Sequence, residues 1–325
     1  MNNQSFKVQL GDKEIAFELA NWAEQANGNV LVQIGDTVAL VTCVMSKGEI
    51  PNQGFFPLTV DYEEKFYAAG KILGSRFVRR EGRPSDEATI TARLIDRAIR
   101  PLFPKELKNE VQVIVTCLSW DAKQDPDIPG LAAASLALSL SDIPWKGPLG
   151  VVRVGRVQGT FVLNPTYEER TQSDLDFVLA GVKEGKDVLF NMIEAESDEV
   201  PEQIYEEALQ YAKPFLLNLI EFQEKLIKES GQEKVAFSQA ALEYKELEQE
   251  MAKWLGERLE QALFQGGKQN RMEAVNDLKI EMTAFVQEKH QDSKKTNYAR
   301  DFFETELDRI VHKAAVEHEQ RVDAR

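Results

Sequence analysis

FVRREGRPSDEATITARLIDRAIRP, Phe77 to Pro101, holds six of the sixteen arginines of this 325-residue chain. Ser85 followed by two acidic residues is a typical helix start, and Pro101 ends the run because proline cannot continue a helix. Three arginines recur at helical spacing inside it: Arg93, Arg97 and Arg100. The apolar residues fall on the other side. The stretch therefore predicts an amphipathic helix with one side in a core and guanidinium groups on the other.

The loop before this helix carries three more arginines: Arg79, Arg80 and Arg83. Phe77 adds an aromatic ring beside them. Guanidinium groups bind phosphate oxygens through paired hydrogen bonds, and aromatic rings stack on bases. Loop and helix together therefore favour contact with single-stranded nucleic acid. From spacing alone the alternative stays open that these arginines pair with carboxylates, such as Glu81 and Asp96, on an ordinary surface helix.

Charge is distributed unevenly along the chain. Its 39 Lys and Arg against 54 Asp and Glu give a formal charge of −15, which argues against a surface that binds nucleic acid everywhere. Between Lys71 and Arg100, however, eight basic residues outnumber four acidic ones. Because salt screens charge over roughly 8 to 10 Å, a ligand at this stretch would feel mainly the local positive charge.

Several classes of protein are disfavoured by the composition. The first twenty residues lack an apolar run behind a basic segment, and no window reaches the roughly 18 apolar residues of a membrane span. We therefore expect a cytoplasmic protein without membrane partners. Cys43 and Cys117 lie in strand-like runs and are predicted to be buried, unlinked thiols. The three histidines have no partners at ligand spacing, so no metal site is predicted.

Turn signals divide the first two hundred residues into short strands. Hairpins are predicted at residues 11–12, 35–36, 158–159 and 184–186, where glycine-containing turns separate strand-like runs. The small-residue run DPDIPGLAAASLALSLSDIPW predicts a helix packed closely on a sheet, with Asp127 as its N-cap. A longer helix is predicted over 201–228. After a linker at 229–237, residues 238–319 show only helical spacing and predict an all-helical domain, and 320–325 are expected to begin a further linker.

Four long motifs, in order along the chain, resemble the polynucleotide phosphorylases, a family of bacterial phosphorolytic 3′-to-5′ exoribonucleases. They are GDTVALVTCVMS, FFPLTVDYEEKFYAAGKI, the arginine stretch and DPDIPGLAAASLALSLSDIPW. The resemblance implies an α+β fold: a ribonuclease PH-like βαβα core of the ribosomal protein S5 domain 2-like type over 1–228, then a small all-α domain. It also implies polyribonucleotide nucleotidyltransferase activity in mRNA degradation, with release of nucleoside diphosphates.

The resemblance implies that catalysis belongs to a second core, which this sequence does not contain. In the active core a serine-rich phosphate loop precedes the small-residue helix, whereas DPDIPG has no serine cluster. The active core also has an Asp, then Asp-Phe-Lys. Here Arg170 stands for the first acid, Asp176 keeps the second, and Val178 replaces the lysine. One carboxylate facing an arginine does not hold Mg²⁺, so we expect no catalytic or metal-binding residue in this chain. Mg²⁺ and inorganic phosphate are implied for the intact enzyme.

RNA-binding residues follow from the same resemblance. Phe77, Arg79 and Arg80 match the family's constriction, although Val78 stands where a second Phe is common. Further basic positions of the family's first core match Arg83, Arg93, Arg97, Arg100 and Arg153. The implied partners are single-stranded RNA, further copies of the chain in a homotrimer, and RNA-degradation proteins such as ribonuclease E and a helicase.

Two other hypotheses stay open. The chain could be a stand-alone, non-catalytic module for RNA binding and assembly. It could instead be an unrelated α+β protein whose arginine helix is held by salt bridges. A second ribonuclease PH-like core after the helical domain would favour the enzyme over the stand-alone module. The fold of the first domain would distinguish the enzyme from an unrelated α+β protein.

Overall fold

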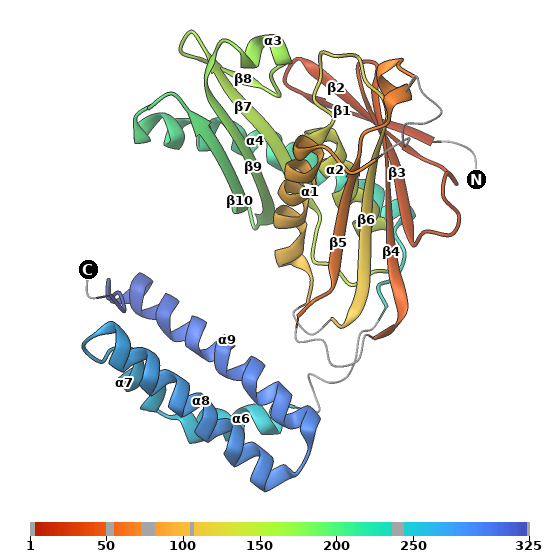
Figure 1. Ribbon diagram of the computed structural model, residues 1–325. Helices are drawn as coiled ribbons and strands as arrows, with labels where there is room; N and C mark the ends of the chain where they lie inside the picture. The colour runs from red at the N-terminus through yellow and green to blue at the C-terminus, as the bar shows by residue number, and fades with distance from the viewer. Residues whose placement is uncertain (1–3, 50–54, 73–81, 105–106, 236–243, 324–325) are drawn as a thin grey trace. The chain divides into compact units, whose positions relative to one another are not determined.

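The computed structural model describes residues 4–49, 55–72, 82–104, 107–235 and 244–323. The chain divides into two compact units, Met1–Phe237 and Ser238–Arg325 (Figure 1). The first unit contains two β-sheets with helices between and beside them. The second unit contains only helices in its described part.

The first sheet has six strands in the order β1-β2-β3-β4-β6-β5. Its strands are β1 (Gln4–Leu10), β2 (Lys13–Leu19), β3 (Gly28–Ile34), β4 (Thr37–Glu49), β5 (Leu58–Glu63) and β6 (Asn109–Ser119). All neighbours are antiparallel except β5 and β6, which are parallel. A parallel pair needs a crossover connection, and here that connection contains helix α1 (Asp86–Ile99). The arginine helix therefore belongs to a βαβ unit.

The second sheet has four antiparallel strands in the order β10-β9-β7-β8. They are β7 (Leu149–Val157), β8 (Thr160–Leu163), β9 (Ser173–Glu184) and β10 (Asp187–Ser197). A short helix, α3 (Tyr167–Arg170), connects β8 to β9. All four predicted hairpins are present: β1–β2, β3–β4, β7–β8 and β9–β10.

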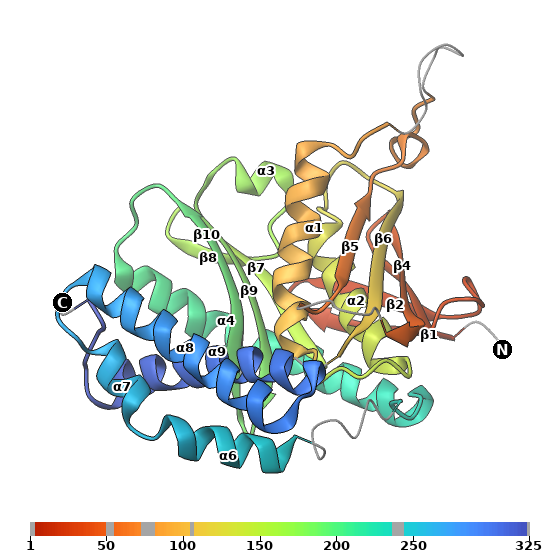
Figure 2. The same ribbon diagram turned by 60° about the horizontal axis from the view of Figure 1, so that its bottom comes forward.

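Helix α1 forms as its sequence predicts. The Ser85 hydroxyl oxygen accepts a hydrogen bond from the backbone N–H of Ala88 at 2.9 Å, which caps the helix start. The apolar side of the helix is buried: Leu94, Ile95, Ala98 and Ile99. Figure 2 shows α1 running alongside β5, and it also contacts β10. Contacts on both sheets fix the direction in which its polar side points.

Helix α2 (Asp127–Leu140) is buried along its whole length and contacts β3, β4 and β7. Small residues make this possible: a Cβ atom at Gly130 would lie 2.9 Å from Val115 Cγ1. The close helix-sheet contact expected from the sequence is therefore confirmed. The start of α2 differs from the prediction, since Pro126 and not Asp127 occupies the N-cap position. Asp127 is the first residue of the helix, where its carboxylate accepts from the backbone N–H of Ile128 and pairs with Arg153.

Helix α4 (Glu202–Ser230) packs on β7, β9 and β10 and contains Pro214. The residues that follow it, predicted as a linker, are held along the end of α2 in their described part. The backbone N–H groups of Gln232 and Val235 donate to the carbonyl oxygens of Leu140 and Asp142. This segment is therefore part of the first unit as far as Val235.

The second unit contains α6 (Lys245–Leu255), α7 (Arg258–Leu263), α8 (Lys268–His290) and α9 (Ser293–Glu317). The all-helical character predicted for this part of the chain therefore holds for its described residues. Gly256, at φ 48°, ends α6 in a conformation that side chains rarely adopt, so the chain turns there. The buried core of this unit includes Met251, Met282 and Phe303.

Both cysteines are buried and free, as predicted. None of the described helices combines the length and the apolar character that a membrane crossing requires.

Candidate functional site

The structure describes five of the eight predicted RNA-binding residues. Phe77, Arg79 and Arg80 lie outside the described residues, so their contacts with RNA stay predictions. The other five are described: Arg83, Arg93, Arg97, Arg100 and Arg153. These five fall into three different environments.

Arg83 and Arg93 are exposed, and neither has an ion-pair partner among the described residues. Arg83 precedes the cap of α1, and Arg93 lies on its polar side. Both guanidinium groups therefore face solvent with donors available to a phosphate. Arg97 is also exposed, but it pairs with Glu194 on β10.

Arg100 uses its donors within the fold. Its guanidinium group binds both carboxylate oxygens of Asp96, at 2.6 and 3.0 Å. It also donates to the carbonyl oxygens of Phe56 and Leu58, each at 3.2 Å. These contacts connect the end of α1 to the start of β5. The alternative in which the arginines pair within the protein thus describes Arg97 and Arg100, but not Arg83 or Arg93.

Arg153 is buried in the middle of β7 and only 8% exposed. Its guanidinium nitrogens approach three carboxylates: Asp125 at 3.1 Å, Asp127 at 3.0 Å and Asp176 at 3.0 Å. The contact with Asp176 is a close ion pair but not a well-aligned hydrogen bond. Arg153 therefore lies among protein carboxylates.

Arg170 joins the same group from the end of α3. It lies 2.8 Å from Asp125 Oδ2 and 3.0 Å from Asp176 Oδ2. A capping box sets this helix, because the Thr166 hydroxyl accepts from Glu169 N–H while the Glu169 carboxylate accepts from Thr166 N–H. We call the five residues the ion-pair network: Asp125, Asp127, Arg153, Arg170 and Asp176.

The ion-pair network has three acids and two bases, so it would carry one net negative charge if every group were ionised. Burial raises the pKa of Asp127 to about 7, and the Arg153 guanidinium opposes this rise. Burial alone would lower the pKa of Arg153, but the carboxylates of Asp127, Asp176 and Asp125 outweigh it and raise that pKa. The arginine thus stays charged, and Asp127 binds a proton more readily than an exposed carboxyl group does.

The residues of the network do not fit a divalent cation. Its three carboxylates each lie within 3.1 Å of a guanidinium nitrogen, so Mg²⁺ would have to displace an arginine and then sit beside its charge. Nothing in the described part of the chain groups three or more His, Cys, Asp or Glu side chains as a metal would need. Val178, where the family's active core has its lysine, is 2% exposed in the hydrophobic core.

A pocket of about 860 Å³ lies against the ion-pair network. Its lining includes four network residues, four aromatic residues with different exposure, and exposed residues of both charges. The aromatic residues are Tyr62, Phe66, Trp120 and Tyr167, the exposed cations are Lys71 and Arg83, and the exposed acids are Glu64 and Glu87. Phe66 belongs to a short 3-10 helix, η1 (Phe66–Ala69). Aromatic and charged groups therefore line the same pocket.

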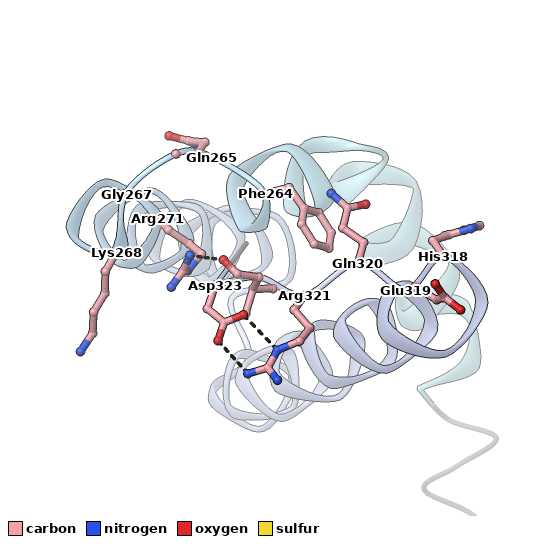
Figure 3. Close-up of a pocket in the computed structure, with 12 residues that line it drawn as sticks. Phe264, Gln265, Gly267, Lys268, Arg271, His318, Glu319, Gln320, Arg321 and Asp323 are labelled. Carbon is pink, nitrogen blue, oxygen red and sulfur yellow. Dashed lines mark hydrogen bonds and ion pairs between the residues drawn. The ribbon is translucent and has the colours of Figure 1, made fainter. Parts of the chain in front are cut away.

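The second unit has its own pocket, of about 690 Å³, between the α7–α8 turn and the residues after α9. Figure 3 shows two of its arginines engaged with neighbours: Arg271 donates to the carbonyl oxygen of Val322, and Arg321 pairs with Asp323 at 2.7 Å. No residue predicted to bind RNA lines this pocket.

Sequence reasoning missed the acidic partners of Arg153 and the aromatic lining of the larger pocket. One signal was present for the first. Arg153 interrupts the apolar strand VVRVGRV, and a charged residue in a buried strand requires an opposite charge nearby. Asp125 and Asp127, at the start of the buried helix, are acids that could supply this charge. The aromatic residues come from separate segments, and no local pattern unites them.

Comparison with known proteins places both halves of the first unit in one family. Residues 12–144 match the family model described as 3′ exoribonuclease family, domain 1, and residues 147–213 match domain 2. A polyribonucleotide nucleotidyltransferase of Heliobacterium modesticaldum is 41% identical over 325 residues, covering 99% of this chain and 44% of that protein. One from Thermus thermophilus is 40% identical, covering 98% and 45%. The chain therefore spans less than half the length of these curated relatives.

Solved structures share the fold at low identity. Rice (Oryza sativa) Rrp46 superposes with a TM-score of 0.54 at 12% identity, covering 70% of this chain and 94% of its own. A chain of the Archaeoglobus fulgidus exosome with RNA bound to the active site superposes with a TM-score of 0.50 at 20% identity, covering 66% and 87%. Together with the family models, they confirm the predicted ribonuclease PH-like core.

Proposed function

The chain belongs to the 3′ exoribonuclease family, among the polyribonucleotide nucleotidyltransferases, and on that premise we propose that it is the RNA-guiding, non-catalytic part of a phosphorolytic exoribonuclease. In the whole enzyme, single-stranded RNA passes the arginine stretch on its way to a second core. There inorganic phosphate attacks the terminal 3′ linkage, with Mg²⁺ as the metal, and nucleoside diphosphates leave. The cellular process is mRNA degradation.

The ion-pair network is the observation that carries this proposal. Arg170 and Asp176 stand where the active core has acids, and here they pair with each other at 3.0 Å. Carboxylates that neutralise arginines in this way are poor metal ligands and poor general bases. Arginines with their donors filled by carboxylates are likewise poor binders of phosphate. The chemistry therefore belongs elsewhere in the enzyme.

The guiding role rests on exposed cations. Arg83 and Arg93 are exposed and have no ion-pair partner in the part of the chain that the structure describes, and Phe77, Arg79 and Arg80 precede them in the sequence. Charge and stacking together suit a single strand because phosphates and bases alternate along it. Assembly as a homotrimer would bring three such stretches to one strand. Association with ribonuclease E and a helicase belongs to the same proposal.

A phosphorolysis assay tests whether this chain alone lacks catalytic activity. The 325-residue chain, given poly(A), phosphate and Mg²⁺, should release no ADP, while the Thermus thermophilus relative assayed beside it supplies the positive control. Release of ADP by this chain at a rate near the relative's would overturn the proposal.

RNA binding is tested across a salt series with fluorescent oligo(A). Replacing Arg79 and Arg80 with Ala should weaken binding and reduce the salt slope by roughly 0.7 for each lost phosphate contact. Phe77→Ala should lower affinity by roughly 1 to 3 kcal/mol without changing the slope, since the ring carries no charge. Arg97→Ala is the matched control because Arg97 already pairs with Glu194. A double variant that melts normally and binds with unchanged slope would show that the loop arginines are structural.

A further inference from the structure

The residues that line the pocket beside the ion-pair network differ in exposure. We call its buried lining the inner end, which includes Asp127, 4% exposed, and Arg153, 8% exposed. We call its exposed lining the outer end, which carries both signs of charge: Lys71 and Arg83, and also Glu64 and Glu87. Of these, Lys71 and Arg83 are cations without an ion-pair partner among the described residues, whereas the charges of the inner end are paired. The volume of about 860 Å³ falls within the range of small-ligand sites.

The inner end is unsuited to a phosphate group. The donors of Arg153 and Arg170 already face Asp125, Asp127 and Asp176 at 2.8 to 3.1 Å. An anion would have to displace these carboxylates and would be repelled by them. A neutral group with amino hydrogens meets no such repulsion, since carboxylate oxygens accept hydrogen bonds from it.

Aromatic residues also line the pocket, and two of them contact each other. Trp120 and Tyr167 contact each other edge to face, with ring centroids 6.0 Å apart, and the Arg170 guanidinium lies 5.8 Å from the Tyr167 ring. Phe66 comes from η1, and the backbone N–H of Trp120 donates to Ala68 of that helix at 2.9 Å. Trp120 is still 38% exposed and Phe66 44% exposed. Rings that are fixed yet partly uncovered can stack on a flat ligand.

We propose that this pocket binds one nucleobase with its attached phosphate. The base lies against the aromatic residues, where Phe66 and Trp120 contribute stacking, and the phosphate stays at the outer end beside Lys71 and Arg83. Neither of these two cations has an ion-pair partner among the described residues. The same chemistry is offered by a free nucleotide and by one residue of an RNA strand. The second source rests on the proposed function, and the first does not.

Binding of adenosine, AMP and oligo(A) to the full chain separates these possibilities. Trp120→Leu and Phe66→Leu should each weaken AMP binding by roughly 5- to 150-fold, the effect of losing one stacking ring. Trp22→Leu is the matched control, because Trp22 is 50% exposed and does not line the pocket. Arg83→Gln should weaken AMP binding but leave adenosine binding unchanged, since adenosine has no phosphate. Thermal melting of each variant reports its folding.

The outcomes for the two ligands identify the source of the base. If the pocket variants lose both AMP and oligo(A), the pocket holds a base of the strand, and if they lose only AMP it holds a free nucleotide. If they bind both ligands as Trp22→Leu does, the proposal is overturned, even when oligo(A) still binds through Arg79 and Arg80. If the unaltered chain binds AMP but no oligo(A), the proposed guiding function is wrong and the pocket proposal stands.

A measurement on the unaltered chain guards against variants that do not fold. 4-Thiouridine monophosphate, and oligo(A) carrying one 4-thiouridine, are photo-crosslinked to the protein, and the attached peptides are identified. Attachment at the segments of Phe66 or Trp120 supports the proposal. Attachment only at other segments contradicts it.

Discussion

Arg153 and Arg93 are the same residue type in the same unit, yet their surroundings differ completely. Arg153 has three carboxylates within 3.1 Å and is 8% exposed, whereas Arg93 is exposed and has no ion-pair partner among the described residues. A buried guanidinium must be neutralised by the protein, because removing it from water costs several kcal/mol. An exposed one remains available to a ligand. An arginine therefore stabilises the fold or binds RNA according to what its donors already face.

Removal of Arg153 should have the largest effect on stability. Arg153→Ala would leave the buried Asp127 carboxyl group without its guanidinium partner, and loss of one partner of a buried pair costs roughly 3 to 5 kcal/mol. Arg97→Ala, at a pair with both side chains exposed, should cost about 1 kcal/mol or less. Urea denaturation of the two variants measures both losses of free energy of unfolding. Equal losses of unfolding free energy in the two variants would show that the buried ion pairs of Arg153 stabilise the fold no more than the exposed pair of Arg97.

The protonation of Asp127 should make stability fall as pH rises toward neutrality. Its pKa is about 7 in the folded protein and near the ordinary aspartate value of 3.8 in the unfolded chain. Between these pH values the folded state holds a proton that the unfolded state lacks, so the stabilisation is complete below about 4 and lost by about 7. One proton contributes at most about 1.4 kcal/mol per pH unit.

Asp127→Asn isolates this effect, because an amide does not titrate and every other group is shared with the unaltered chain. Unfolding by urea at several pH values between 4 and 7 should show a less negative slope of stability against pH in the variant. Parallel curves would mean that Asp127 is ionised throughout and that the network carries its negative charge.

Replacing the exposed arginines on α1 and just before it should weaken RNA binding without lowering stability. Arg83→Ala and Arg93→Ala should each reduce the salt slope of oligo(A) binding by roughly 0.7 while the melting temperature stays near that of the unaltered chain. Arg97→Ala should change the slope less, since Glu194 already occupies its guanidinium. A slope that falls equally for Arg93 and Arg97 would show that the Glu194 pair opens when RNA binds.

The smallest expected effect is on thiol reactivity next to the network. Burial raises the pKa of Cys43 to about 12 and that of Cys117 to about 11, so both should react slowly with a thiol reagent at pH 8 until denaturant is added. Arg153→Ala should speed the labelling of Cys117, which lines the same pocket, more than that of Cys43. Rapid labelling of both cysteines in the unaltered chain would contradict their burial.

The elements themselves were largely predictable because they depend on neighbours in sequence. Glycine turns located the four hairpins, and Ser85 with Pro101 bracketed α1 closely. The break between α6 and α7 at Gly256 has no clear local signal, since a helical pattern continues on both sides of that glycine. The family resemblance, carried by long motifs, supplied the ribonuclease PH-like core that short patterns alone left open.

By itself the sequence determined that arginines gather on one helix and its preceding loop, and that their apolar neighbours face a core. Only the tertiary structure decided which of them are free. Arg93 and Arg97 are equivalent in helical spacing, but Glu194, 97 residues further on, lies beside Arg97 and not beside Arg93. Helix and strand formation follow from local backbone and side-chain preferences, whereas an ion pair needs two groups within about 4 Å. Folding of the whole unit sets that distance.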